Sequence, residues 1–312
     1  MSTKISYKVQ NWSSYNKALV ARGNITLWFN DEAVEKWYSK NPTKIRRGRP
    51  NIYSDECIEL ALTLRALFDL PLRGTQGFLM GALKMLGLKL EVPNFTRFSR
   101  RKLNVEIKVS PKSKEEINIV VDSTGLKIYG EGEWKMRTHG KQKRRTWRKL
   151  HLAIDPKTFE TVSMELTEAT VHDDTVMKDL LKEQTNINDV FADGAYVSKN
   201  CFDAIAKTGA KKVHIALRTG TSTVEKNPSA GQELRNKLVR EIRKFGGKIG
   251  WKKKSGYHKR SLVETQMFRF KTILGGHLKS RNLQTQTSEA RIKVKILNKM
   301  SALGMPRSLK TN

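Results

Sequence analysis

The feature that most constrains the fold is a change of pattern between the first third of the chain and the rest. From Ser54 the apolar residues recur at helical spacing, whereas from Ile117 onward short apolar runs of strand length alternate with helical stretches. Such alternation predicts an α/β domain. Adjacent strand-like segments at its start predict that part of the sheet is antiparallel. We therefore expect a helical region at residues 1–110, an α/β domain at 111–300 and a C-terminal tail at 301–312.

The helical region contains successive helix-like stretches separated by short breaks. Ser54 is a typical N-cap for the first stretch, the second covers Thr75–Leu88, and the third begins at Asn94. Helix, break, helix, break and basic helix is the layout of a helix-turn-helix unit, which predicts DNA binding. A helical bundle with a solvated basic face is the alternative. The candidate DNA contacts of the third stretch are Arg97, Arg100, Arg101 and Lys102.

Composition indicates the class of partner. Lys and Arg together number 60 against 30 Asp and Glu, which gives a formal charge of +30. Such a chain is expected to bind a polyanion, with nucleic acid the first candidate and an anionic membrane surface the second. The two cysteines exclude a disulfide scaffold. No apolar run reaches the ~18 residues of a membrane span, so we expect a soluble cytoplasmic protein.

Two aspartates follow apolar strand-like runs in the α/β region. Asp122 comes after Ile119–Val121 and precedes a predicted turn, Ser123–Gly125, while Asp193 comes after Val190–Ala192. A carboxylate at the end of a buried strand is costly unless it is paired, caps a turn or binds a cation. Each could simply cap the turn that follows it. Two such carboxylates in one domain favour a shared site at the edge of the sheet.

A third acid lies on a predicted helix near the end of the domain. From Tyr257 onward, Leu262, Val263, Met267, Phe270, Ile273 and Leu274 form one apolar arc, and Gly275 is expected to end the helix. Arg260, Glu264 and Lys271 fall on the opposite side. An exposed row of ion pairs is one explanation. The other is a nuclease site in which carboxylates hold two divalent ions and the cations hold phosphates.

These residues resemble the DDE transposases of bacterial insertion sequences, and in particular the IS-five-like family. The resemblance rests on DSTG at Asp122, DGAY at Asp193, and the spacing Tyr-(2)-Arg-(3)-Glu-(6)-Lys, which runs from Tyr257 to Lys271. The segments GEGEWKMRTHGKQKRRTWRKLH, LGGHLKSRN and LGMP also look like this family. The likeness covers nearly the whole chain and is firmest from Asp122 to Met305.

The resemblance implies an RNase H-like fold, a mixed sheet with flanking helices, with the acids on the first strand, after the fourth strand and on a later helix. It implies catalytic, metal-binding roles for Asp122, Asp193 and Glu264, with two Mg²⁺ ions that Mn²⁺ can replace. The implied activity is DNA transposition, a form of DNA recombination by a mobile element: endonuclease cleavage at terminal inverted repeats, then joining of the 3′ ends to target DNA. A homodimer or larger synaptic complex, associated with the bacterial nucleoid and not with a membrane, is expected.

Further candidates and rival functions stay open at this stage. Trp134 in a charged region and Tyr257 could stack on bases, and Arg260 and Lys271 are expected to contact DNA. Residues 218–256 form a short basic insertion whose helix is a further candidate DNA contact. A metal-dependent nuclease without strand transfer and a non-catalytic helix-turn-helix regulator are the alternative functions.

Overall fold

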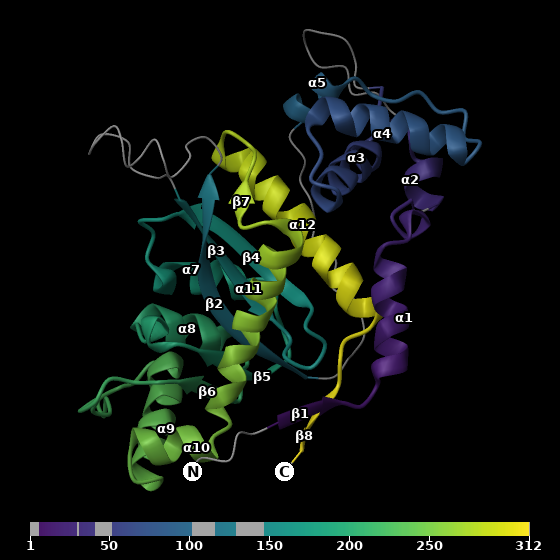
Figure 1. The fold of residues 1–312 in the computed structure, drawn as a ribbon. Helices are drawn as coiled ribbons and strands as arrows, with labels where there is room; N and C mark the ends of the chain where they lie inside the picture. Colours follow the sequence, from purple (N-terminus) through teal and green to yellow (C-terminus); the bar gives the residue numbers. More distant parts are fainter. Residues whose placement is uncertain (1–5, 30, 41–51, 102–115, 129–146, 312) are drawn as a thin grey trace, which may run out of the picture. The chain divides into compact units, whose positions relative to one another are not determined.

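The computed structural model describes residues 6–29, 31–40, 52–101, 116–128 and 147–311 (Figure 1). The chain separates into two compact units. One comprises Glu106–Arg291, and the other comprises Met1–Val105 together with Ile292–Asn312. By this division residues 292–300, expected in the α/β domain, and residues 301–312, expected as a separate tail, belong to the unit that contains the N-terminal region.

Both ends of the chain meet in this first unit. The strands β1 (Ser6–Val9) and β8 (Ser308–Thr311) pair antiparallel. The carboxamide of Asn11 donates to the carbonyl of Met305 at 3.0 Å and accepts from the amide of Arg307 at 2.7 Å. These pairings satisfy the backbone of both ends, which explains why the last residues do not form a separate tail.

The helices of the first unit are α1 (Trp12–Arg22), α2 (Asp31–Glu35), α3 (Asp55–Leu67), α4 (Leu72–Met85), α5 (Phe95–Arg100) and the second part of α12 (Leu283–Leu303), with the 3₁₀ turn η1 (Ile25–Leu27). Ser54 caps α3 as predicted, since its hydroxyl accepts the amide of Cys57 at 3.0 Å. The second helix begins earlier than predicted, because Pro71 occupies its N-cap and does not interrupt it. The helices α3, α4 and α5 pack on one another.

The second unit is built on a six-stranded mixed sheet. Its strands are β2 (Ile117–Ile128), β3 (Trp147–Ile154), β4 (Thr161–Glu168), β5 (Ile187–Ala192), β6 (Lys212–Ile215) and β7 (His277–Leu278). The order is β4-β3-β2-β5-β6, with β7 also pairing with β2. The pairs β2–β3 and β3–β4 are antiparallel, whereas β2–β5 and β5–β6 are parallel. This mixed sheet with flanking helices is consistent with the expected RNase H-like fold.

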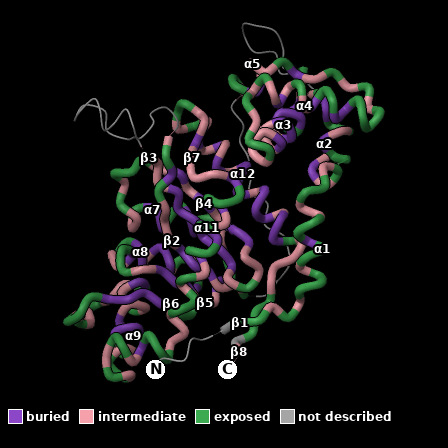
Figure 2. The backbone as a smooth tube through the Cα atoms, viewed as in Figure 1, coloured by how far each residue is buried: buried purple, intermediate pink, exposed green. Residues whose placement is uncertain are grey.

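Helices cover both faces of this sheet. On one face, α7 (Asp173–Leu181), α8 (Lys199–Lys207), α9 (Ala230–Lys244) and α10 (Lys248–Lys254) share a core with apolar side chains of β2, β5 and β6. On the other face, α11 (Ser261–Leu274) packs on β2 and β3. The buried residues accordingly gather along the sheet and the inner sides of these helices (Figure 2). The 3₁₀ turns η2 (Gly194–Tyr196) and η3 (Tyr257–Arg260) follow β5 and precede α11.

The turn predicted after Asp122 is wrong. Residues 117–128 form one continuous strand, and Ser123, Thr124 and Gly125 pair with His151, Leu150 and Lys149 of β3. Gly125 has a different reason to be small: a Cβ there would lie 3.1 Å from Cε3 of Trp147. Glycine inside a strand often marks such a close approach.

Candidate active site

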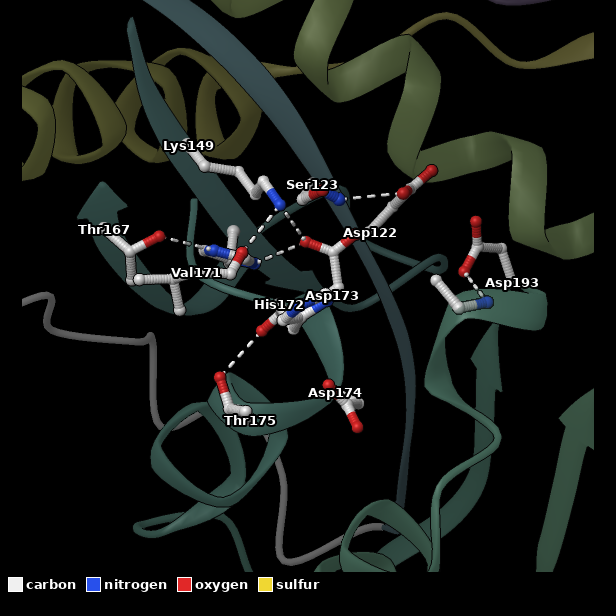
Figure 3. Close-up of polar contacts among 12 residues, drawn as sticks. Asp122, Ser123, Lys149, Thr167, Val171, His172, Asp173, Asp174, Thr175 and Asp193 are labelled. Carbon is white, nitrogen blue, oxygen red and sulfur yellow. Dashed lines mark hydrogen bonds and ion pairs between the residues drawn. The ribbon is translucent and has the colours of Figure 1, made fainter. Parts of the chain in front are cut away.

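Asp122 lies in the middle of β2, the strand at which the antiparallel and parallel parts of the sheet meet. Its partner on β3 is Leu152, and its side chain is 15% exposed. One carboxylate oxygen, Oδ1, accepts the backbone amide of Ser123 at 2.8 Å (Figure 3). The sheet therefore holds Asp122 rigidly and leaves Oδ2 for another partner.

Asp193 follows β5 directly, as the sequence predicted. It is the N-cap of η2, and its Oδ1 accepts the amide of Ala195 at 2.8 Å. The register of the parallel pair aligns Val120 with Phe191. Asp122 and Asp193 each come two residues later, so they follow the same face of the sheet on neighbouring strands, which lie ~4.8 Å apart. The two aspartates are thus brought together.

Glu264 is brought to this face by α11, and Arg260 connects it with Asp122. The Nη1 atom of Arg260 lies 3.2 Å from Oδ2 of Asp122, and its Nη2 lies 2.5 Å from Oε1 of Glu264. A single guanidinium thus bridges carboxylates from a strand and a helix that are far apart in the sequence. Glu264 is exposed and Arg260 partly buried. The pairing of Arg260 with Glu264 matches the helical spacing found in the sequence.

The electrostatics show how closely these charges interact. The pKa of Asp122 is raised to about 6, mainly by burial; the charges of Asp193 and Glu264 act in the same direction, whereas the Ser123 amide and Arg260 oppose the rise. Burial also raises the pKa of Tyr257 in η3, and the three acids add to this effect while Arg260 opposes it. Tyr257 therefore lies within electrostatic range of the three acids.

The carboxylate oxygens of Asp122, Asp193 and Glu264 are suitable ligands for a divalent cation, but the three side chains are not arranged around a common point. Across the described ranges, no three His, Cys, Asp or Glu side chains lie close enough to hold a metal ion. Arg260 explains this spacing, because its guanidinium occupies the position between Asp122 and Glu264. A partly buried carboxylate beside two others is a site whose charge a divalent ion would compensate, and carboxylate oxygens are the ligands that Mg²⁺ prefers.

A second group of charges, which the sequence did not predict, lies near Asp122 (Figure 3). Lys149 of β3 is 3.1 Å from Asp173 at the start of α7 and donates to the carbonyl of Val171 at 2.8 Å. His151 is fully buried and its Nε2 lies 3.0 Å from the hydroxyl of Thr167. Because the members are separated in the sequence and have no characteristic spacing, only the strand register could have indicated them.

The other residues predicted to contact DNA have no described contact with the three acids. Lys271 is exposed on α11 and contacts neither Glu264 nor Arg260; its stem lies beside Gly276. In the first unit, Arg97 stacks over Tyr53 at 5.7 Å and Arg100 is exposed. Arg101 forms an ion pair with Asp55 at 2.6 Å. Trp134 and Lys102 lie outside the described residues.

Comparison with protein families shows to which family the chain belongs. Two family models, each described as a transposase DDE domain, match residues 20–131 and residues 113–299. The second match covers more than half of the chain and contains Asp122, Asp193 and Glu264. The chain therefore belongs to the DDE transposase family, the enzymes of DNA transposition by mobile elements. Membership implies DNA binding and, in general, the use of divalent metals. In the part of the chain that the structure describes, no helix is long and apolar enough to cross a membrane.

Proposed function

We propose that this protein is the transposase of a bacterial insertion sequence of the IS-five-like group. In this proposal it binds the terminal inverted repeats of its element, cuts the DNA there and joins the freed 3′ ends to target DNA. Two ends must be held together, so the active form is a homodimer or a larger synaptic complex on the bacterial nucleoid. The single observation that carries the proposal is the convergence of Asp122, Asp193 and Glu264 on one face of a mixed sheet.

Each residue of the site has a proposed role. Two Mg²⁺ ions, replaceable by Mn²⁺, supply the Lewis acidity that activates an attacking oxygen and stabilises the leaving oxygen. Asp122, Asp193 and Glu264 would hold them through carboxylate oxygens. When the carboxylates take up a metal charge, Arg260 is free to grip a DNA phosphate with two N–H donors. Tyr257 orients the strand beside Arg260, and Lys271 adds a more distant phosphate contact.

Cleavage and strand transfer are tested separately. The protein is incubated with DNA that carries its element ends, with Mg²⁺ or with EDTA, and the cuts are mapped; precut ends with a free 3′-hydroxyl then test joining to a target plasmid. Metal-dependent cuts at the ends together with joined products support the proposal. Cuts without joining favour a nuclease that only hydrolyses. Equal DNA binding in EDTA with no metal-dependent cleavage favours a non-catalytic regulator.

Recognition of the repeats is proposed for the helix-turn-helix-like helices α3–α5 and for Lys102, while Trp134 is proposed to stack on an unpaired base. Removing residues 1–110 is a poor test, because Ile292–Asn312 belong to the same unit. Substitution of Arg97 and Arg100 by Gln is a better test. Arg101 is left unchanged, because its loss would also break the ion pair with Asp55. The expected result is a loss of preference for element ends over random DNA. A Gln pair at two exposed lysines of the same region, Lys84 and Lys89, is the control.

A further inference from the structure

The insertion after β6 presents a concentrated row of positive charge. Two helices, α9 and α10, lie within it, and every residue from Ala230 to Lys254 is described. None of its exposed cations forms an ion pair with a residue that the structure describes. We call these residues the α9–α10 ridge: Lys237, Arg240, Arg243, Lys244, Lys248, Lys252, Lys253 and Lys254.

Packing holds the ridge in place. The opposite side of α9 is buried against the domain core through Leu238 and Val239, so the basic side must face solvent (Figure 2). The start of α9 is fixed by a capping box between Ser229 and Gln232. Gly250 lets α10 approach the end of α9, because a Cβ there would lie 2.0 Å from the carbonyl oxygen of Phe245. The cations therefore sit on a preorganised scaffold.

The α10 end of the ridge is connected to the three acids through Tyr257. In α10, Trp251 is fully buried and its ring lies 5.2 Å from that of Tyr257. The ammonium group of Lys252 lies 5.1 Å from the centre of the same Tyr257 ring. Tyr257 is within electrostatic range of Arg260 and the three acids. One path of positive and aromatic groups thus runs from α9 through α10 to the candidate active site.

The ridge has the chemistry of a surface for a sugar–phosphate backbone. On α9, Lys237, Arg240 and Lys244 recur every three or four residues on one side and span ~10 Å along the helix. That length covers about three phosphates of one DNA strand. Surfaces for single strands rely on exposed aromatic rings, and the fully described α9 and α10 expose none. A membrane-bound helix needs an exposed apolar face, whereas that face of α9 is buried.

We infer that the α9–α10 ridge binds the backbone of duplex DNA that flanks the cleavage site, without reading its sequence. This inference deepens the proposed function and rests on it for the identity of the DNA. The ridge would hold the duplex while Arg260 and the acids act on one strand. Its contribution to binding does not need a metal ion.

The test compares two variants with the same loss of charge. In the ridge variant, Lys237, Arg240 and Lys244 become Gln. In the control variant, three exposed lysines become Gln: Lys178 on α7, Lys182 at the C-cap of α7 and Lys207 on α8. Affinity for a short duplex of arbitrary sequence is measured in EDTA over a series of salt concentrations. In a plot of log affinity against log salt concentration, each lost phosphate contact should lower the magnitude of the slope by ~0.9. The slope of the ridge variant should therefore be smaller than that of the parent by roughly 2.7, and the slope of the control variant should change far less.

Several outcomes overturn the inference. Equal slopes for the two variants would mean that the ridge does not lie on DNA. A larger loss for a single-stranded oligonucleotide than for the duplex, or a loss confined to anionic lipid vesicles, would assign the ridge to a different partner. Thermal unfolding checks both variants, and if either unfolds, the single changes Arg240→Gln and Lys178→Gln replace them.

Failure of the ridge is distinguishable from failure of the proposed function. A parent protein that does not bind duplex DNA at all overturns both. A parent that binds, with variants that do not differ, overturns only the ridge. Because the assay contains EDTA, a protein that fails to cleave its element ends can still confirm the ridge.

Discussion

Two carboxylate–cation clusters lie on opposite faces of the strands β2 and β3. On the α11 face, Arg260 bridges Asp122 and Glu264. On the α7 face, Asp173 pairs with Lys149 and faces the ring of His151. Side chains of neighbouring residues along a strand point to opposite faces. The same pair of strands therefore carries both clusters, a few residues apart.

The clusters differ in what satisfies their charges. Asp173 and Lys149 are each about one-fifth to one-quarter exposed, at 21% and 24%, and Lys149 also binds the carbonyl of Val171. On the other face, one guanidinium serves two carboxylates, with Asp193 adding further negative charge. The first cluster is compensated within the fold, whereas the second has an excess of negative charge that favours an added cation. Under the proposed function, this difference separates a structural charge cluster from the candidate catalytic one.

The largest effect on activity is expected for substitution of the three acids on the α11 face. Asp122→Asn, Asp193→Asn and Glu264→Gln should each abolish metal-dependent cleavage, because the amides keep the shape but lose the charge that binds the metal. The loss should exceed ~100-fold, since even an outer-shell partner of a metal ligand contributes about 10–100-fold. DNA binding in EDTA should be largely unchanged. Cleavage rates on end DNA and binding isotherms measure the two effects.

Asp173→Asn is the matched control on the opposite face. It should leave cleavage within a few-fold of the parent and instead lower the free energy of unfolding by about 1–3 kcal/mol, because Lys149 and His151 lose their carboxylate partner. The comparison fails if Asp173→Asn abolishes cleavage, or if any of the three acid variants cuts at the parental rate.

The second prediction concerns the bridging cation. Arg260→Lys should lower the cleavage rate by about a hundredfold, because Lys cannot make two parallel N–H contacts and positioning dominates phosphoryl transfer. Lys271→Arg should be much milder, since Lys271 makes no contact with Glu264. Single-turnover cleavage and thermal unfolding measure activity and fold separately. Full cleavage by Arg260→Lys, or an unfolded domain, would leave Arg260 only a structural partner of the acids.

Much of the second unit was predictable from the sequence, because its elements are marked by local signals. The strand β5 ends in front of Asp193 as predicted, and Gly275 ends α11 with a positive φ of 81°. Glu264 lies on the helix that the apolar periodicity predicts. These features depend on residues close in the sequence, so pattern alone indicates them.

The remaining features depend on contacts between distant segments. The polar run at Ser123 suggests a turn, but pairing with β3 keeps the strand continuous. On α11, Gln266 is fully buried and hydrogen-bonded to Thr161, whereas Ile273, expected in the core, is 39% exposed. Helical periodicity indicates the apolar side of a helix but not which neighbours cover it.

A pH experiment sharpens the contrast further. Burial lowers the pKa of His151 to about 4, and Lys149 adds to this effect while Asp173 opposes it. The unfolded chain binds a proton at the ordinary pKa of 6.5, whereas the folded chain resists it until about pH 4. Stability should therefore fall as the pH falls through this window, by about 3 kcal/mol in total. His151→Gln should remove this dependence.

The measurement is urea unfolding of the parent and of His151→Gln at several values between pH 7 and pH 4. The contribution of Asp122 to the pH dependence of stability has the opposite sign. Because the pKa of Asp122 is raised in the folded state, stability falls as the pH rises from 3.8 towards about 6. That contribution is the same in both proteins and cancels in their difference. A difference that does not change with pH would mean that His151 binds its proton equally well in the folded and the unfolded chain, so that folding does not lower its pKa.

The smallest expected effect belongs to Tyr196, which lies within electrostatic range of acids from both clusters. Its side chain is fully buried, and its hydroxyl has no hydrogen-bond partner among the residues that the structure describes. Burial raises its pKa, and Asp173, Asp122 and Asp193 raise it further, so the phenol stays neutral. A buried hydroxyl without a partner costs roughly 1–3 kcal/mol. Tyr196→Phe should therefore raise the free energy of unfolding in EDTA by about 1 kcal/mol.

Urea unfolding measures this effect, with Tyr257→Phe as the control because the Tyr257 side chain is only partly buried. If Tyr196→Phe is less stable than the parent, the hydroxyl donates to one of the neighbouring carboxylates, and the clusters on the two faces are joined through it. If Tyr196→Phe is more stable than the parent, the Tyr196 hydroxyl does not connect the two clusters. The charges around Asp173 are then compensated without Tyr196, and those around Asp122 depend on Arg260 or on a cation from solution.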